Sequence, residues 1–318
     1  MGYSPFLESV RVELRTRRYS IKTEKVYLFW IKSFILFNDK KHPAKMGNQE
    51  IERFLNHLAM NRQVSPATQN QALCAIIFLY RYVIKKEIRG LSYSFTKKDY
   101  VMPTVLSHQE AKRIIDNMSG IHKLIASILY GSGLRINEAL RLRVKDIDLE
   151  HNMVFVFRGK GRKDRYSLLP KSLHEAISRQ IEKVKTLHQQ DLSEGYGLTS
   201  LPPALMRKYG NAIKDFSWQY LFPSTTRCIH PYDGYICRHH IHGSAFRKSL
   251  RKAVLLAEIP KRVKAHTFRH SFATELLLQG TDIRTVQELL GHTDLKTTEI
   301  YTHVVGSRFG NTLSPVDR

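Results

Sequence analysis

Apolar positions in the first 85 residues recur at helical spacing. Five large side chains stand at i, i+3, i+4, i+7 and i+8: Tyr27, Trp30, Ile31, Phe34 and Ile35. Residues 51–58 repeat the pattern, and Ser65-Pro66 supplies an N-cap and a first-turn proline for a helix that continues to Ile84. One apolar face per helix predicts a small bundle of about four helices with the aromatic face in its core.

A polar, glycine-containing stretch separates this bundle from the rest of the chain. We therefore predict a helical domain over residues 1–88, a linker over 89–103 and a second domain over 104–318. Ser107 and Glu110 form a capping-box pattern, which opens the first helix of the second domain.

The second domain combines helices with one short hairpin. Apolar residues over 121–129 predict a buried helix that stops at the glycines before Arg135. The sequence VFVF at 154–157 predicts a strand, RGKGRKDR a turn with Lys160 at its tip, and YSLLP the returning strand. A long helix is expected near 172–187. The predicted fold is mainly α with a small β-sheet.

The last 60 residues place polar side chains at helix ends. His266 and Arg269 share one helix face because they are three residues apart. Asp282 is a predicted N-cap, and the helix that it opens ends just before His292. Tyr301 lies on the next short helix. Any meeting of these side chains has to come from tertiary packing.

The net charge of the chain indicates the class of its binding partner. The chain has 51 Lys and Arg against 28 Asp and Glu, a net charge of +23, of which residues 1–100 contribute +10 and the remainder +13. Both domains can therefore contact a polyanion, and DNA is the expected partner; the alternative is a basic protein without a specific polyanion. Outward-facing basic residues of the first domain, read alternatively as solvated charges, are candidates for phosphate contact: Arg15, Arg17, Arg18, Lys22 and Lys25.

No apolar run approaches the roughly 20 residues that a membrane span needs, and the N-terminus has no signal-peptide core. We expect a cytoplasmic protein with no membrane partner, in which the three cysteines need not pair. A Cys/His-rich run over 228–242 raises the question of zinc, but its spacing fits no common zinc pattern, so no metal is expected. Within it, His239 and His240 are interpreted as facing DNA or packing a helix.

Six polar residues of the second domain form an ordered chemical set: Arg135, Lys160, His266, Arg269, His292 and Tyr301. Arginine suits planar, bidentate recognition of phosphate oxygens. Tyr301 can attack phosphorus and keep the energy of the broken bond in a phosphotyrosyl ester, so that strands rejoin without ATP. Lys160 can protonate the leaving 5′-oxygen. The set predicts cleavage and rejoining of a DNA phosphodiester without metal or other cofactor.

The segments that carry this set resemble the tyrosine recombinase (phage integrase) family. The resemblance covers nearly the whole chain, and its matching segments are YGSGLRINEALRLRVKDID at 130–148, RGKGRKDRYSLLP at 158–170 and HTFRHSFATELLLQGTDIRTVQELLGHTDLKTTEIYTHV at 266–304. The resemblance implies an N-terminal SAM-like core-binding domain and a catalytic domain that form a C-shaped clamp around DNA. It also implies a tetramer on two DNA segments, in which the C-terminal tail docks on a neighbouring protomer.

The resemblance also implies roles for the six residues. Tyr301 forms a 3′-phosphotyrosyl intermediate, and three residues hold the scissile phosphate: Arg135, Arg269 and His292. His266 assists proton transfer at the nucleophile, and Lys160 is the hairpin lysine. The flanking His270 and His303 are interpreted as structural residues.

A finer resemblance points to the integron integrases. It rests on an additional segment over 191–224, on RHHIH at 238–242 and on TLSP at 312–315. This likeness implies recombination between a duplex attachment site and a gene-cassette site that is used as a folded single strand. Three aromatic residues of the segment are candidates for contact with extruded bases, with packing against the catalytic domain as the equal alternative: Trp218, Tyr220 and Phe222.

Three other functions stay open at this point. The first is a phage-type or housekeeping recombinase that acts on two duplex sites, as the Xer recombinases do. The second is a DNA-binding regulator without catalysis, which the complete set of six residues argues against. The third is a type IB topoisomerase-like enzyme with the same chemistry but no sequence requirement.

Overall fold

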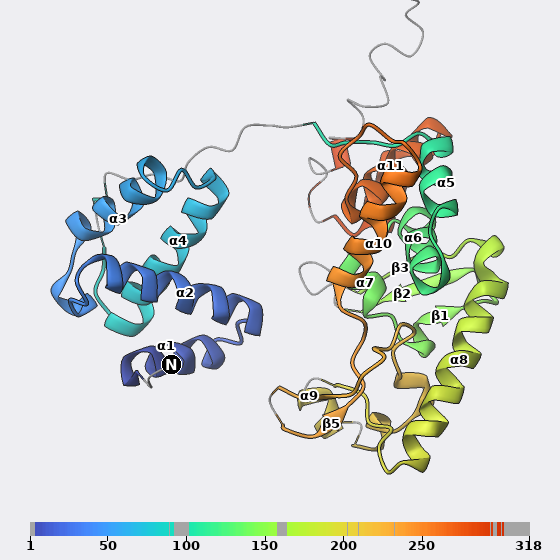
Figure 1. The fold of residues 1–318 in the computed structure, drawn as a ribbon, viewed down its shortest axis with the longest axis horizontal. Coiled ribbons are helices and arrows are strands. Elements are labelled where there is room, and N and C mark those ends of the chain that lie inside the picture. The colour runs from blue at the N-terminus through green and yellow to red at the C-terminus, as the bar shows by residue number, and fades with distance from the viewer. Residues whose placement is uncertain are drawn as a thin grey trace, which may run out of the picture. The chain divides into compact units, whose positions relative to one another are not determined.

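The protein divides into two compact units, Met1–Val101 and Met102–Arg318, in the computed structural model (Figure 1). The structure describes residues 4–88, 90–91, 102–157, 164–201, 203–208, 210–231, 233–292, 294, 298–299 and 301. None of the helices within these ranges is long and apolar enough to cross a membrane.

The N-terminal unit is a bundle of helices. Its elements are α1 (Pro5–Thr16), α2 (Ile21–Phe37), the 3-10 turn η1 (Pro43–Lys45), α3 (Asn48–Met60), α4 (Pro66–Phe78) and the π-helical turn η2 (Leu79–Ile84). The side chains of Ser4, Ser20 and Ser65 cap the N-termini of α1, α2 and α4. The predicted helical bundle is confirmed, and the third predicted helix ends in a π-helical turn.

The predicted aromatic face lies in the core of this unit. Trp30, Ile31 and Phe34 are buried, and the ring of Phe34 packs edge to face on Phe54 of α3 with centroids 5.6 Å apart. The buried hydroxyl of Tyr80 donates to the carbonyl of Pro43 at 3.0 Å, so the polar atom of a core aromatic is satisfied.

The second unit holds helices around a three-stranded sheet. Its helices are α5 (His108–Asp116), α6 (Gly120–Ser132), α7 (Ile136–Leu140), α8 (His174–Ser193), α9 (Pro203–Lys208), α10 (Gly243–Leu256), α11 (Ala265–Leu278) and α12 (Ile283–Leu290). Its 3-10 turns are η3 (Val144–Asp146), η5 (Lys171–Leu173), η6 (Gly210–Ile213) and η7 (Phe216–Trp218). Its strands are β1 (Ile147–Asp148), β2 (Met153–Val156), β3 (Arg165–Leu168), β4 (Cys228–Ile229) and β5 (Ile236–Cys237).

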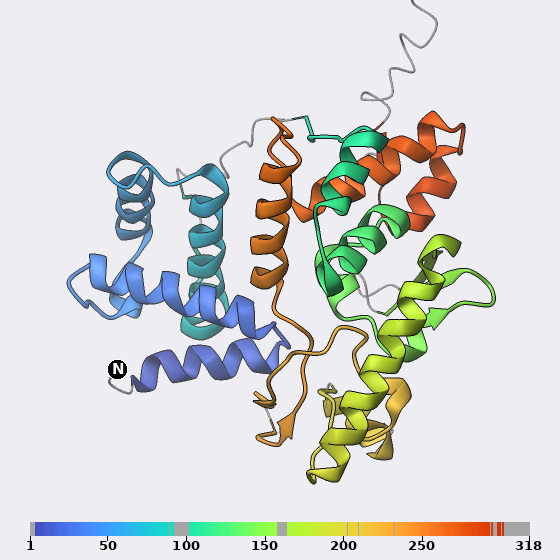
Figure 2. The same cartoon turned by 45° about the vertical axis from the view of Figure 1, so that its right-hand side comes forward.

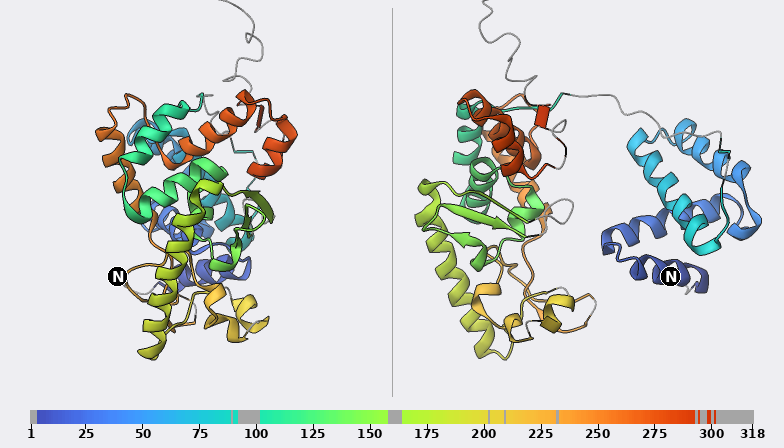
Figure 3. Two further views of the ribbon diagram at one scale, coloured as in Figure 1. Left: turned by 90° about the vertical axis from the view of Figure 1, so that its right-hand side faces the viewer. Right: turned by 180° about the vertical axis from the view of Figure 1, so that it is seen from behind.

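The predicted hairpin is confirmed. The strands β1, β2 and β3 form an antiparallel sheet in that order, with Met153 opposite Leu168 and Val156 opposite Arg165. The turn between β2 and β3, which carries Lys160, lies outside the described residues. The long helix α8 runs past the sheet to the end of the unit that holds α9 and β5 (Figures 2 and 3).

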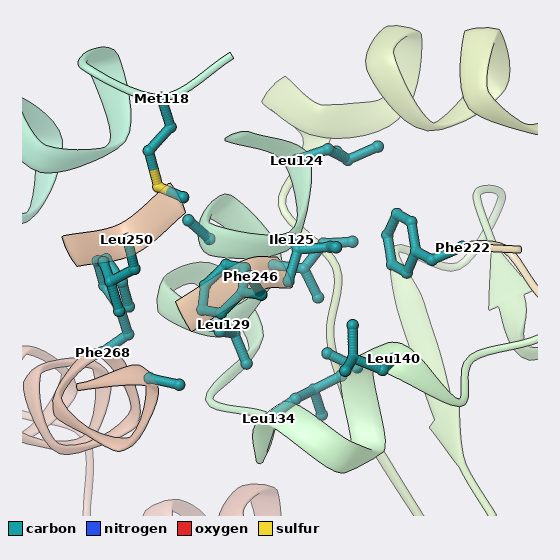
Figure 4. Close-up of a cluster of buried hydrophobic side chains, with 14 of the residues drawn as sticks. Met118, Leu124, Ile125, Leu129, Leu134, Leu140, Phe222, Phe246, Leu250 and Phe268 are labelled. Atoms are coloured by element: carbon teal, nitrogen blue, oxygen red, sulfur yellow. The ribbon is translucent and has the colours of Figure 1, made fainter. Parts of the chain in front are cut away.

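The core of this unit centres on α6. Figure 4 shows Ile125 and Leu129 of this helix among Phe246 and Leu250 of α10 and Phe268 of α11. All five are at most 3% exposed. The core thus joins α6 to the consecutive helices α10 and α11, far later in the chain, and fixes α11, which carries two of the predicted site residues.

The segment over 191–224 is tied to the body of this unit by Arg143. The guanidinium donates to Thr199 Oγ1 at 3.2 Å and to the carbonyl of Ser200 at 2.9 Å, and it also bonds the carbonyl of Trp218. Tyr220 and Phe222 are buried, so the packing interpretation holds for these two. Trp218 is half-buried, with Lys145 Nζ 3.2 Å from its ring centroid.

The Cys/His-rich run forms a short hairpin of β4 and β5. Cys228 and Cys237 stand opposite each other in this hairpin as free cysteines, with their sulfur atoms 4.0 Å apart. His239 and His240 pack against the ring of Tyr220, with centroids 5.3 Å and 5.2 Å away. In the described part of the chain no three His, Cys, Asp or Glu side chains are grouped so that they could hold a metal ion.

Candidate active site

A glycine allows the approach of the two helices behind the site. Gly133 ends α6 with φ of 62°, and a Cβ at this position would lie 2.3 Å from the ring of Phe272 on α11. Only glycine fits both the left-handed backbone and this contact. The chain then turns into α7 with Arg135 as its N-cap residue. In this position the charge of Arg135 acts on Arg269.

Glu138 gathers the arginines of the site. Its carboxylate accepts from Arg135 Nη1 at 2.8 Å and from Arg165 Nη2 at 2.7 Å, and Arg269 Nη1 lies 3.9 Å away. Burial by itself raises the pKa of Glu138, but the hydrogen bonds and charges of Arg165 and Arg135 outweigh it and bring this pKa to about 2. Three guanidiniums around one carboxylate leave a surplus of positive charge.

Arg269 is fully buried, with 0% of its side chain exposed. Its Nη1 donates to the carbonyl of Gly133 at 2.8 Å and its Nη2 to that of Leu290 at 2.6 Å. Burial, and after it the charge of Arg135, lowers the pKa of Arg269 to about 9, so the side chain is still protonated at neutral pH. Its Nε finds no acceptor among the described residues, which leaves a buried donor able to meet an anion.

His292 follows the left-handed Gly291 that ends α12. Its Nε2 lies 3.0 Å from Nη2 of Arg269, and its Nδ1 lies 2.9 Å from Thr298 Oγ1. Because a guanidinium can only donate, Nε2 is the acceptor and the ring proton sits on Nδ1, toward Thr298. The ring is nearly parallel to that of Tyr301, with centroids 6.3 Å apart.

Tyr301 is buried beside these groups, with 2% exposure. Its hydroxyl lies 2.9 Å from Nδ1 of His270, and the ring of His270 in turn meets that of His266 edge to face at 4.6 Å. Burial raises the pKa of Tyr301, whereas the charges of Arg269 and Arg135 oppose the rise. Burial, followed by the charges of His266 and Arg269, lowers the pKa of His270 to about 4.

Five of the six predicted site residues therefore meet in one cluster: Arg135, His266, Arg269, His292 and Tyr301. Lys160 and His303 lie outside the described residues. Two members of the cluster, Glu138 and Arg165, were not predicted. Glu138 stands three residues after Arg135, and that capping pattern is a signal that could have found it. No local signal links Arg165 to Glu138, because 27 residues separate them.

Comparison with known proteins assigns both units to the phage integrases. Residues 104–308 match the Phage integrase family, and residues 6–89 match the N-terminal SAM-like domain of phage integrases. An Escherichia coli protein named Integrase/recombinase is 41% identical over 312 residues, 98% of this chain and 93% of that protein. Tyrosine recombinase XerC of Halalkalibacterium halodurans is 34% identical over 315 residues, 96% of this chain and 93% of that protein.

Solved structures share the fold. The XerH site-specific recombinase bound to palindromic difH substrate, a post-cleavage complex, aligns with a TM-score of 0.62 at 23% identity, over 98% of this chain and 84% of that one. The Tn1549 transposon integrase in complex with transposon right end DNA aligns with a TM-score of 0.60 at 17% identity, over 93% and 94%. At these identities the likeness establishes the fold alone.

Fold and matches together define a site-specific DNA recombinase that acts through a covalent tyrosine intermediate. The chain belongs to the phage integrase family of tyrosine recombinases. The predicted family and the predicted mainly α fold with an N-terminal SAM-like domain are confirmed.

Proposed function

We propose that this recombinase is of the integron integrase type. It exchanges strands between a duplex attachment site and a folded single-stranded cassette site, and so integrates and excises gene cassettes. The alternative is a Xer-type or phage-type recombinase that acts on duplex sites. The presence of XerC and XerH among the similar proteins supports this alternative.

Tyr301 is the proposed nucleophile and forms a 3′-phosphotyrosyl bond. Arg135, Arg269 and His292 hold the scissile phosphate, with Lys160 as the acid that protonates the leaving 5′-oxygen and His266 as an aid to proton transfer. The observation that carries this assignment is the surplus of guanidinium charge around Glu138 beside the buried phenol of Tyr301, whose raised pKa the charges of Arg269 and Arg135 oppose. Such preorganised donors stabilise charge that develops on a phosphoryl group in the transition state.

Support for the integron type comes from the segment over 191–224 and from the residues that hold it. Arg143 fixes this segment through three of its carbonyl and hydroxyl oxygens, so it is built as part of the catalytic unit. Trp218 is one of its half-buried aromatic residues. A fixed segment that carries a partly exposed aromatic ring suits a strand with protruding bases better than a regular duplex.

DNA is the proposed partner of both domains, the core-binding domain over 1–88 and the catalytic domain over 104–318, joined by the linker over 89–103 and closing on DNA as a clamp. The net charge of +23 supports this assignment. We further propose a tetramer on two DNA segments, in which the tail after Val305 docks on a neighbouring protomer. Normal strand exchange by a protein that is truncated after Val305 would contradict the tail's role.

Covalent trapping tests the function. The protein is incubated either with a cassette-type hairpin oligonucleotide nicked near the crossover or with a nicked duplex attachment site, and adducts that survive denaturation are scored. The proposal expects an adduct on the folded strand that Tyr301→Phe abolishes. An adduct on duplex sites alone would favour the Xer-type alternative, and an adduct that persists in Tyr301→Phe would exclude this tyrosine as the nucleophile.

A further inference from the structure

The hydroxyl of Tyr301 has a partner outside the six residues discussed above. His270, on the same turn of α11 as Arg269, places Nδ1 2.9 Å from the Tyr301 oxygen. The distance is that of a direct hydrogen bond. His266, one turn earlier on α11, is exposed and packs edge to face on His270, so the two histidines stand in series from the surface to the phenol.

The protonation states of this pair are fixed by their surroundings. Burial and the charges of His266 and Arg269 bring the pKa of His270 to about 4, so its imidazole is neutral at physiological pH. The phenol of Tyr301, whose pKa burial raises, is neutral as well. A neutral imidazole has one acceptor nitrogen, and a phenol in contact with it donates its proton to that nitrogen. His270 Nδ1 is thus the acceptor and Nε2 carries the ring proton.

We propose that His270 receives the proton of Tyr301 when the phenol attacks DNA, a role that rests on Tyr301 being the nucleophile as proposed above. The O–H bond of Tyr301 breaks and its proton passes to the lone pair of His270 Nδ1. The phenolate oxygen forms a bond to the scissile phosphorus, the bond from phosphorus to the 5′-oxygen breaks, and that oxygen takes up a proton from the general acid. Religation returns the proton from His270 to the phenol oxygen.

The surrounding charges tie this transfer to the presence of substrate. In the free protein, Arg269 and His266 oppose a positive charge on His270. A bound phosphate brings negative charge next to the same arginine, offsets that repulsion and makes His270 a better proton acceptor. Tyr301 then loses its proton only when a phosphodiester is in place, which protects the enzyme from holding an unpaired buried phenolate.

The test compares His270→Gln with a matched control. His108 on α5 places Nδ1 3.2 Å from the hydroxyl of Tyr130, which is the same kind of pair outside the site, so His108→Gln reports the general effect of the change. The probes are the nicked cassette-type hairpin and the nicked duplex site. We expect adduct formation to slow about 100-fold in His270→Gln, the lower range for loss of a general base, and to keep its wild-type rate in His108→Gln.

A second readout separates proton transfer from a structural effect. Replacing Tyr301 by 3,5-difluorotyrosine makes the phenol more acidic. In the His270→Gln background this replacement should raise the rate of adduct formation at least 10-fold, whereas in the wild-type background it should change that rate far less. A 19F NMR spectrum of the free protein with 3-fluorotyrosine at position 301 should shift its resonance in His270→Gln but not in His108→Gln.

The outcomes distinguish this inference from the function on which it rests. If the wild-type protein forms no adduct through Tyr301 on either probe, the proposed function fails and the role of His270 falls with it. If the adduct forms through Tyr301 and His270→Gln reacts at the wild-type rate, the function stands and His270 is not the proton acceptor. A slow His270→Gln that fluorination does not rescue, with an unshifted 19F resonance, would overturn the proposal in favour of a packing role.

Discussion

Two buried carboxylates of the catalytic unit are each surrounded by arginines, but the two clusters differ in their balance of charge. Glu138 lies among Arg135, Arg165 and Arg269. Asp191, near the end of α8, is bonded by Arg227 and Arg238, with Nη2 of Arg238 at 2.6 Å. Both carboxylates are at most 8% exposed in their side chains.

The difference lies in how the remaining donors are used. Arg238 gives its Nη1 to the carbonyls of Ser224 and Thr225 at 2.8 Å and 3.0 Å, and Arg227 also pairs with Glu194. The charges around Asp191 therefore balance, and the cluster holds β5 and the 191–224 segment to α8. Around Glu138 the arginines outnumber the acid and Arg269 Nε has no acceptor among the described residues. A balanced cluster builds structure, whereas a cluster with surplus charge is built to bind an anion.

Matched substitutions of one arginine in each cluster should give the largest contrast. Arg269→Lys keeps the positive charge but loses the planar fork of donors, and we expect adduct formation to fall by about 10²–10³-fold, as for removal of one preorganised donor. Arg238→Lys should leave the rate per folded molecule unchanged. Single-turnover cleavage of the nicked probes measures both. Equal losses in the two variants would remove the distinction between the clusters.

Removing the balanced arginine should instead cost stability. Arg238→Ala leaves Asp191 buried with half of its partners, and we expect the free energy of unfolding to fall by about 3 kcal/mol, the usual cost of breaking a buried ion pair. Urea unfolding of the full chain provides the measurement. Glu194→Gln, which alters an exposed partner of Arg227, is the control and should leave the unfolding midpoint unchanged. An unchanged free energy of unfolding in Arg238→Ala would mean that other contacts, such as those of Arg143, hold the 191–224 segment without this ion pair.

A smaller effect is expected from pH. The pKa of Glu138 is about 2 in the folded protein against an ordinary glutamate value of 4.5, so its carboxylate stabilises the fold above pH 4.5. That contribution fades as the pH falls toward 2. The full shift corresponds to about 3 kcal/mol, of which only part is lost by pH 3. Unfolding free energies at pH 6 and pH 3 should therefore differ less in Glu138→Gln than in the wild-type protein. The same difference in both would show that Glu138 is not the titrating group.

Much of the fold and part of the site could be predicted from local pattern. The helices around Trp30 and Phe34 follow from apolar spacing, and the caps at Ser65, Ser107 and Asp282 lie where the sequence places them. Arg269 and His292 could be predicted as site residues because both lie in the long segment over 266–304 that resembles the family. By contrast, Tyr220 and Phe222 had two equal interpretations in the sequence, and only their burial decided for packing.

The sequence by itself determined most of the helices, the β2–β3 hairpin, the family and the chemical set of arginine, histidine and tyrosine. Helix periodicity, caps and motifs depend on residues that lie close together along the chain. The tertiary structure alone decided which partners those groups have. Glu138 meets Arg165 across 27 residues, and His270, which is not one of the six predicted site residues, contacts Tyr301 across 31. Such pairings depend on how the fold brings α7, α11 and β3 together, and no spacing within a single helix or strand encodes that arrangement.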